Sequence, residues 1–233
     1  GARFIGADLR EAVLEATRLT GAVWTNGMAC GEGSTGRCLT PALKRLLEEN
    51  HCPGCDLRGV HLRGLAVSGA DLAAARLQRA DLRRARLMGA NLRQAALGEA
   101  LLSGADLSEA YLAAIDAMGA DLSDARLPGA YLHHARLVRT VLRGADLSGA
   151  DLRRAVIEES DLGGARLRGA DLADASLLGS DLRGADLSGA HLSGANLTHA
   201  RVAGANWEGA YLEGARWVDG RLCGAGSLGE CRQ

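Results

Sequence analysis

The stretch GADLSGADLRRA, Gly144 to Ala155, decides the fold. It repeats a five-residue unit of a small residue, a polar residue, an apolar residue and two further polar or small residues. From Leu57 to Trp217 the apolar position recurs every fifth residue in 33 consecutive units, and leucine fills 27 of them. The position two residues earlier is alanine in 26 of the 33 units. A period of five matches neither an α-helix nor a β-strand.

This period fits a square coil in which each unit makes one side and one corner. Leucine and alanine would then point inward, and the remaining positions would lie at corners and in solvent. The pattern resembles the pentapeptide-repeat family, whose motif is A-(D/N)-L-x-x, over residues 55–217 and, as a shorter block, 2–24. The resemblance implies an all-β solenoid, a right-handed quadrilateral β-helix, and implies almost nothing about chemistry. About eight coils would form a rod on the order of 40 Å long, with both ends in need of a cover.

A second element occurs twice in the chain. The segments WTNGMACGEGSTGRC, Trp24 to Cys38, and WVDGRLCGAGSLGEC, Trp217 to Cys231, agree at 8 of 15 positions. In each copy a tryptophan ends a run of repeats, and an Asn-Gly or Asp-Gly turn and a cysteine-bounded loop follow it. We therefore expect this element to terminate a solenoid, with Trp24 or Trp217 covering the open column of apolar side chains.

The segment TPALKRLLEENH, residues 40–51, is predicted to form a short α-helix. Thr40 is a suitable N-cap, and Pro41 suits the first helical position. The helix should cap the first coil of the main block and cover its open sheet edge. We expect the apolar face of this cap to consist of Leu43, Leu46 and Leu47.

The repeats and the caps divide the chain into four parts. The short repeat block, residues 1–24, has only five repeats, too few to be stable alone. It could be the end of a preceding unit in a tandem array, an extra coil on the main solenoid, or a coil stacked on another subunit. The chain starts at Gly1 without a signal peptide, so we expect a processed or excised form. The parts are the short repeat block 1–24, the cysteine-containing loop and capping helix 25–54, the main solenoid 55–217, and the cysteine-bounded C-terminal cap 218–233.

Six cysteines lie in or beside the caps, and six cysteines allow 15 pairings. The duplicated element favours the disulfides Cys30–Cys38 and Cys223–Cys231, which leaves Cys52–Cys55 as a third pair. The alternatives are free thiols or a structural zinc site formed by four of these residues. Disulfides would indicate an oxidising compartment, the periplasm or the extracellular space. The similarity to exported bacterial members of the family, which combine a cysteine-rich cap with the solenoid, implies the same. The zinc alternative would use Cys30, Cys38, Cys52 and Cys55.

Residues 20 apart should stack on one side of the rod, so the sequence predicts its surface. Tyr111 and Tyr131 should be exposed neighbours, with Tyr211 on the same side, and we take them as a possible partner surface. The alternative is that these rings only stack on one another. Another column contains Met118, Val138 and Leu178, a modest apolar strip that could face a partner or the short repeat block. On a further side acidic and basic residues should alternate as a solvated ladder that fixes register: Arg86, Asp106, Arg126, Asp146, Arg166 and Asp186.

Charge and motifs limit the possible functions. The chain has 27 basic and 28 acidic residues and a net charge of -1, which gives no reason to expect nucleic acid as a partner. Known catalytic motifs are absent from the sequence, and we predict no enzyme activity, no metal and no cofactor. No apolar run approaches the roughly 18 residues of a membrane span.

We therefore expect a non-enzymatic structural or interaction scaffold. It would be a rigid periplasmic or extracellular rod that binds a protein partner or associates with itself through its ends or flat sides. The alternative, implied by the resemblance, is a DNA-mimic protein that interacts with DNA gyrase in the manner of quinolone-resistance proteins. That role is associated with a strongly acidic surface, and the balanced charge of this chain disfavours it.

Overall fold

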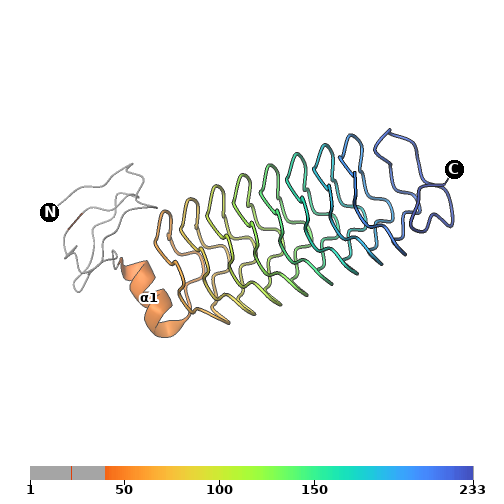
Figure 1. The fold of residues 1–233 in the computed structure, drawn as a ribbon. Helices are drawn as coiled ribbons and strands as arrows, with labels where there is room; N and C mark the ends of the chain where they lie inside the picture. The colour runs from red at the N-terminus through yellow and green to blue at the C-terminus, as the bar shows by residue number, and fades with distance from the viewer. Residues whose placement is uncertain (1–21, 23–39, 233) are drawn as a thin grey trace.

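The described part of the chain is a rod of stacked coils. The computed structural model describes Ala22 and residues 40–232. Helix α1 (Pro41–Glu49) lies at one end of the stack, and the C-terminal loop lies at the other (Figure 1). Parallel bridges join residues 20 apart, from His51↔Asp71 to Asn196↔Arg216, and they stay isolated instead of lengthening into strands within the described region. The architecture is a four-sided parallel β-helix, as the five-residue period predicts.

Backbone hydrogen bonds tie each coil to the next and close each corner. The N–H of Leu57 donates to the carbonyl of Arg76 at 2.8 Å, and the N–H of Arg76 donates back to the carbonyl of Cys55 at 2.9 Å. At the corner, the N–H of Val60 donates to the carbonyl of Leu57, and Gly59 between them has φ 62°. A positive φ at the third residue is what a type II turn requires, and glycine adopts it without steric penalty.

The core consists of the two apolar columns on each side. The central leucines from Leu57 to Leu197 are at most 3% exposed, and the alanines two residues before them are similarly buried. Fully burying one leucine side chain contributes roughly 1.5–3 kcal/mol. The interior is narrow, because leucines from four sides meet in it, and this explains why the second column is almost always alanine.

The Asp or Asn before each central leucine has a structural role. Asp121 Oδ1 accepts the N–H of Ser123 at 3.0 Å, and Asn196 Oδ1 accepts the N–H of Thr198 at 3.1 Å. The same bond recurs along the rod: the Asp before the central leucine accepts the backbone N–H of the residue two positions later. Short polar side chains make this bond readily, and it supports the turn that follows. In these units the Asp or Asn therefore helps to build the corner in addition to facing solvent.

Helix α1 lies across the first coil. The side chain of Thr40 accepts the N–H of Leu43 at 3.2 Å, and Pro41 is the first helical residue. Leu43 and Leu46 are at most 1% exposed and belong to the same buried cluster as the solenoid leucines. Leu47, which we grouped with them, is 38% exposed, because it follows Leu46 by about 100° around the helix.

At the opposite end, residues 221–232 fold back on the last coil. Leu222 pairs with Arg216 and Leu228 pairs with Tyr211, both in antiparallel bridges. Trp217, the last central apolar residue, is half-buried and meets Trp207 edge to face with ring centroids 5.2 Å apart. The loop therefore covers part of the open end.

Candidate functional site

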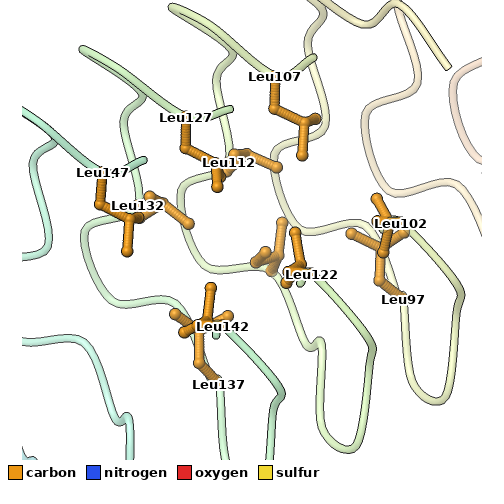
Figure 2. A pocket seen from close by; sticks show the side chains of 11 residues that line it. Leu97, Leu102, Leu107, Leu112, Leu122, Leu127, Leu132, Leu137, Leu142 and Leu147 are labelled. Atoms are coloured by element: carbon orange, nitrogen blue, oxygen red, sulfur yellow. The ribbon is translucent and has the colours of Figure 1, made fainter. Parts of the chain in front are cut away.

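The interior of the rod is filled by apolar side chains in the described region. A small cavity of about 10 Å³ is enclosed by leucines between residues 97 and 147 and by Ile115, as Figure 2 shows. A cavity of this size is at the lower limit for one water molecule, and its purely apolar lining offers no hydrogen-bond partner. Among the described residues, no group of three or more His, Cys, Asp or Glu side chains could hold a metal ion. The polar, charged and aromatic side chains that could form a site lie on the outer surface.

The most distinctive outer surface is one side of the rod, which we call the tyrosine face. Tyr111 and Tyr131 stack with ring centroids 5.1 Å apart and planes 6° from parallel. Farther along the same side, the rings of His191 and Tyr211 lie 4.5 Å apart. Consecutive parallel bridges link all members of the face: Asp71, Asn91, Tyr111, Tyr131, Asp151, Asp171, His191 and Tyr211.

The tyrosine side chains are partly exposed to solvent. Tyr131 covers one ring face of Tyr111, and the guanidinium of Arg93 lies 4.5 Å from the ring centroid of Tyr111. The three tyrosines are between 37% and 48% exposed. Stacked rings are rigid, so ordering them against a partner loses little conformational entropy, and a cation over the ring adds to this rigidity.

Charged groups on the tyrosine face are held in fixed positions. Arg153 donates to both carboxylate oxygens of Asp151 at 2.8 and 2.7 Å, and this bond holds the pKa of Asp151 below its ordinary value. His133 Nδ1 lies 3.4 Å from Asp151 Oδ2, and His133 also meets His134 edge to face. The face therefore combines aromatic rings, the Arg153–Asp151 ion pair and histidines. Aromatic and arginine side chains are enriched in protein interfaces.

Sequence reasoning placed the tyrosines and His191 in one column, in which His191 directly precedes Tyr211. It did not predict the contacts that Arg93 and His133 make with this column. Arg93 and His133 lie two residues beyond this column and reach it only through their side-chain conformations.

The alternating charge ladder stacks as predicted, through the bridges from Arg86↔Asp106 to Arg166↔Asp186. Its carboxylates bind their own corners instead of neighbouring arginines: Asp146 Oδ1 accepts the N–H of Ser148 at 3.1 Å and its hydroxyl at 2.6 Å. Within residues 86–186, none of the ladder's Arg–Asp neighbours lies within 4.0 Å as an ion pair. Burial raises the pKa of Asp146, but the Ser148 bonds and the two flanking arginines lower it further, so the net pKa is below its ordinary value.

The remaining predicted residues lie as follows. The structure contains the disulfides Cys52–Cys55 and Cys223–Cys231, with Cα atoms 5.4 and 4.9 Å apart. Cys52 occupies a leucine position and Cys55 an alanine position of the repeat, so their bond spans one corner.

Met118 is 40% exposed, whereas the other two members of the apolar strip, Val138 and Leu178, are not among the exposed large apolar residues. The predictions for Trp24, Cys30 and Cys38 lie outside the described residues.

Fold and surface together define a β-helical repeat protein with an exposed aromatic face on one side of the rod. Eight copies of the pentapeptide repeats model match the chain over residues 1–23 and, with overlaps, 55–225. The chain therefore belongs to the pentapeptide-repeat family, whose solved members are right-handed β-helices and are generally non-enzymatic structural proteins. A comparison with curated protein sequences gives no match.

Several solved pentapeptide-repeat structures are similar to the chain. HetL, involved in heterocyst differentiation regulation in Nostoc sp. strain PCC 7120, is 31% identical over 78% of this chain and 98% of its own, with a TM-score of 0.29. A trypsin-treated variant of QnrB1, a plasmid-mediated fluoroquinolone resistance protein, is 22% identical over 62% of this chain and 88% of its own, with a TM-score of 0.42. A protein of the Arabidopsis thaliana thylakoid lumen is 30% identical over 50% and 68%, with a TM-score of 0.30.

Proposed function

We propose that the protein is a non-enzymatic scaffold, a rigid rod whose tyrosine face binds a protein partner. The observation that carries this proposal is the stacked, exposed pair Tyr111–Tyr131 with Arg93 over it. Aromatic and arginine side chains held rigidly on a flat surface are typical of the few residues that supply most of the affinity in an interface.

The flanking charges favour a partner with basic groups. Beyond the tyrosines, Asp151 and Asp171 follow on the same face, and both lie near the single guanidinium of Arg153, at 2.7 and 3.6 Å. One arginine leaves this pair of carboxylates with one uncompensated negative charge. A partner that places an aromatic or apolar residue against the rings and a basic residue near Asp171 would match this surface.

We also propose that the protein works in an oxidising compartment, the periplasm or the extracellular space. Two disulfides in the described region, one at each end of the solenoid, support this proposal, because cytosolic thiols are kept reduced. None of the described residues forms a helix with the length and apolarity that crossing a bilayer requires. Intact mass before and after reduction tests the proposal: protein isolated from its native host should carry these bonds, and free thiols there would contradict it.

The gyrase-directed alternative needs a continuous acidic surface. The side that carries Asp81, Asp121, Asp161 and Asp181 has arginines beside three of its four carboxylates. The pairs are Asp81–Arg83, Asp161–Arg143 and Asp181–Arg183, at 2.8 Å or closer. On the ladder side, arginines alternate with the acids. This neutralisation weighs against imitation of duplex DNA, in which every phosphate carries one negative charge.

Site-specific photocrosslinking tests the partner proposal. A photoreactive phenylalanine analogue at Tyr131 should form one dominant covalent adduct with a protein in the native host. The same group at Arg126, on the ladder side, is the matched control and should not capture that protein. The purified partner should then lose affinity for a Tyr111→Ala/Tyr131→Ala variant by at least about tenfold. Equal capture at both positions, or unchanged affinity, would contradict the proposal.

A further inference from the structure

The ladder side of the rod, which carries the six alternating charges from Arg86 to Asp186, keeps these charges unpaired within the described chain. Its three arginines are exposed, and none of them lies within ion-pair distance of a described carboxylate. Elsewhere on the rod arginines do pair with acids of the next coil, as Arg139 does with Glu159 at 2.8 Å. The charges of the ladder side are therefore available to another molecule.

The carboxylates of the ladder are anchored through one oxygen and open at the other. Oδ1 of Asp146 accepts both the N–H and the hydroxyl of Ser148, and Asp106 makes the equivalent bonds. In both aspartates Oδ2 has no described donor. On another side of the rod, the residue two positions after the aspartate is an arginine that occupies Oδ2, as at Asp181. The ladder thus presents acceptors in fixed positions that no arginine of the same unit fills.

The centre of the ladder side is also low in relief. Pro128 and Ser148 stand beside the two central charges of the ladder, and the corners that follow them are Gly129 and Gly149. A Cβ added at Gly149 would meet nothing within 4 Å, so the space over this corner is open. A second flat surface can therefore approach the charged side chains closely.

We propose that the ladder side binds the ladder side of a second copy of the chain, with the two rods antiparallel. A twofold axis between the coils of Arg126 and Asp146 reverses the order of the coils, so Arg126 of each copy faces Asp146 of the other. The same operation sets every other member of the ladder against an opposite charge: Arg86 against Asp186, and Asp106 against Arg166. The ladder is therefore complementary to itself.

Other arrangements of two copies match fewer charges or bring like charges together. Parallel rods in register would place Arg126 against Arg126, and an axis through that residue would do the same. Moving the axis by one whole coil keeps the signs but leaves the ends of the ladder unmatched. The proposed axis also brings Glu109 of one copy beside Arg168 of the other, and these are the two further charges of this side between residues 86 and 189.

The contact is expected to be weak and sensitive to salt. Exposed ion pairs contribute little individually, and dissolved salt screens them. A small flat contact of this kind belongs to the transient class of interfaces. The tyrosine face is a different side of the rod, so this pairing is independent of the proposed partner and leaves that face open.

Sedimentation of the full chain tests the pairing. At about 20 mM salt we expect a dimer that forms between about 0.1 and 1 mM protein, and at about 0.5 M salt we expect the monomer. A chain that is monomeric at about 1 mM in low salt would overturn the proposal, as would an oligomer that salt does not dissociate.

Two charge reversals test the register. Arg126→Glu and Asp146→Arg should each raise the dimer Kd at least about tenfold, because each brings like charges together at both central contacts. An equimolar mixture of the two variants should associate again, with a Kd within about threefold of the parent, because each new charge then faces its opposite. Arg136→Glu, on the opposite side of the rod, is the matched control and should change nothing. A mixture that stays monomeric would overturn the register.

A photocrosslink tests the direction of the rods. Met88 is 52% exposed beside Arg86, and the proposed axis places it opposite residues 186–189 of the second copy. A photoreactive side chain at Met88 should therefore link to those residues in low salt. Links to residues 86–89 of the second copy would mean parallel rods and would overturn the antiparallel arrangement.

Discussion

Ser160 takes the place of a backbone bond in the corner that contains Thr140. Its Oγ accepts the N–H of Thr140 at 3.0 Å and donates to the carbonyl of Leu137 at 2.5 Å. In the regular corners these two backbone groups bond to each other, as Ala120 N–H does with the Ala117 carbonyl at 3.0 Å. The hydroxyl of one coil thus bridges the corner of the coil before it.

Because of this bridge, we expect the Ser160 hydroxyl to contribute more to the stability of the fold than the other hydroxyls in its column. We expect Ser160→Ala to lower the free energy of unfolding by about 1–3 kcal/mol, because two buried backbone groups lose their partner. The control is Ser180→Ala, where the hydroxyl donates only to the Ile157 carbonyl and the Ser180 N–H keeps its own corner bond. Chemical denaturation should rank Ser160→Ala as the more harmful, and the reverse order would refute the bridging role.

A second prediction concerns the corner residues whose backbone has a positive φ. Gly149 has φ 64°, and a Cβ added there would meet nothing within 4 Å. Gly149→Ala should therefore lower the unfolding free energy by about 1–2 kcal/mol purely through backbone strain. Gly98→Ala is the control: its φ lies outside the positive range, and the new Cβ would be 3.7 Å from its nearest neighbour. That variant should be neutral or up to about 1 kcal/mol more stable.

A third prediction concerns Ile115 and Ala117, whose side-chain sizes are exchanged relative to the usual repeat. Ile115 stands where the repeat has alanine, and Ala117 stands where it has leucine, and both are buried. Ile115 lines the small cavity that Figure 2 shows, together with Leu97 and Leu137, which precede and follow Ala117 in its column. The larger residue therefore compensates for the smaller one within a single repeat unit.

A double-mutant cycle measures this compensation. Ala117→Leu alone should overpack the core and lower the unfolding free energy by about 1–3 kcal/mol, and Ile115→Ala alone should lower it by about 2–5 kcal/mol. The double variant restores the usual repeat and should be more stable than the sum of the two effects predicts, by at least about 1 kcal/mol. Strict additivity in urea denaturation would show that the two sites do not share space.

Much of this fold is readable from the sequence, because each side of the coil repeats one local pattern. Leu and Ala at fixed spacing determine the register, and the register alone places Tyr111 beside Tyr131. The bridge made by Ser160 was not predictable, since alanine, serine and threonine all fit that column by size. The incomplete burial of Val202 and Trp207 also escaped prediction, because the closing loop has no period from which its path could be derived.

The Asp181–Arg183 pair predicts a dependence of stability on pH. Arg183 donates to Asp181 Oδ2 at 2.5 Å and lowers the pKa of Asp181 from 3.8 to about 2. Because the folded pKa lies below the unfolded one, the pair stabilises the fold above about pH 4, and this contribution is lost as the pH falls towards 2. Arg183 is largely exposed, so solvent screening keeps the contribution of the pair small.

Asp181→Asn isolates this charge, because the amide oxygen can still accept the corner N–H of Arg183. The variant should be less stable than the parent at pH 5, and the difference should shrink as the pH approaches 2. Asp124→Asn, at an exposed corner, serves as the control for the loss of one negative charge. A difference that is constant across this range would show that Asp181 does not act through its ionised form.

The last prediction concerns the disulfide Cys223–Cys231, which closes the loop over the final coil. Replacing both cysteines with serine should destabilise this loop by about 2–3 kcal/mol on the basis of loop-closure entropy. In a repeat protein each coil contacts only its neighbours, so the loss should fray the end without unfolding the rod. Amide exchange at Leu212 and Gly214, whose acceptors lie in the loop, should accelerate, whereas exchange at Leu152 in mid-rod should not change. Equal acceleration at all three amides would mean that the disulfide stabilises the whole solenoid.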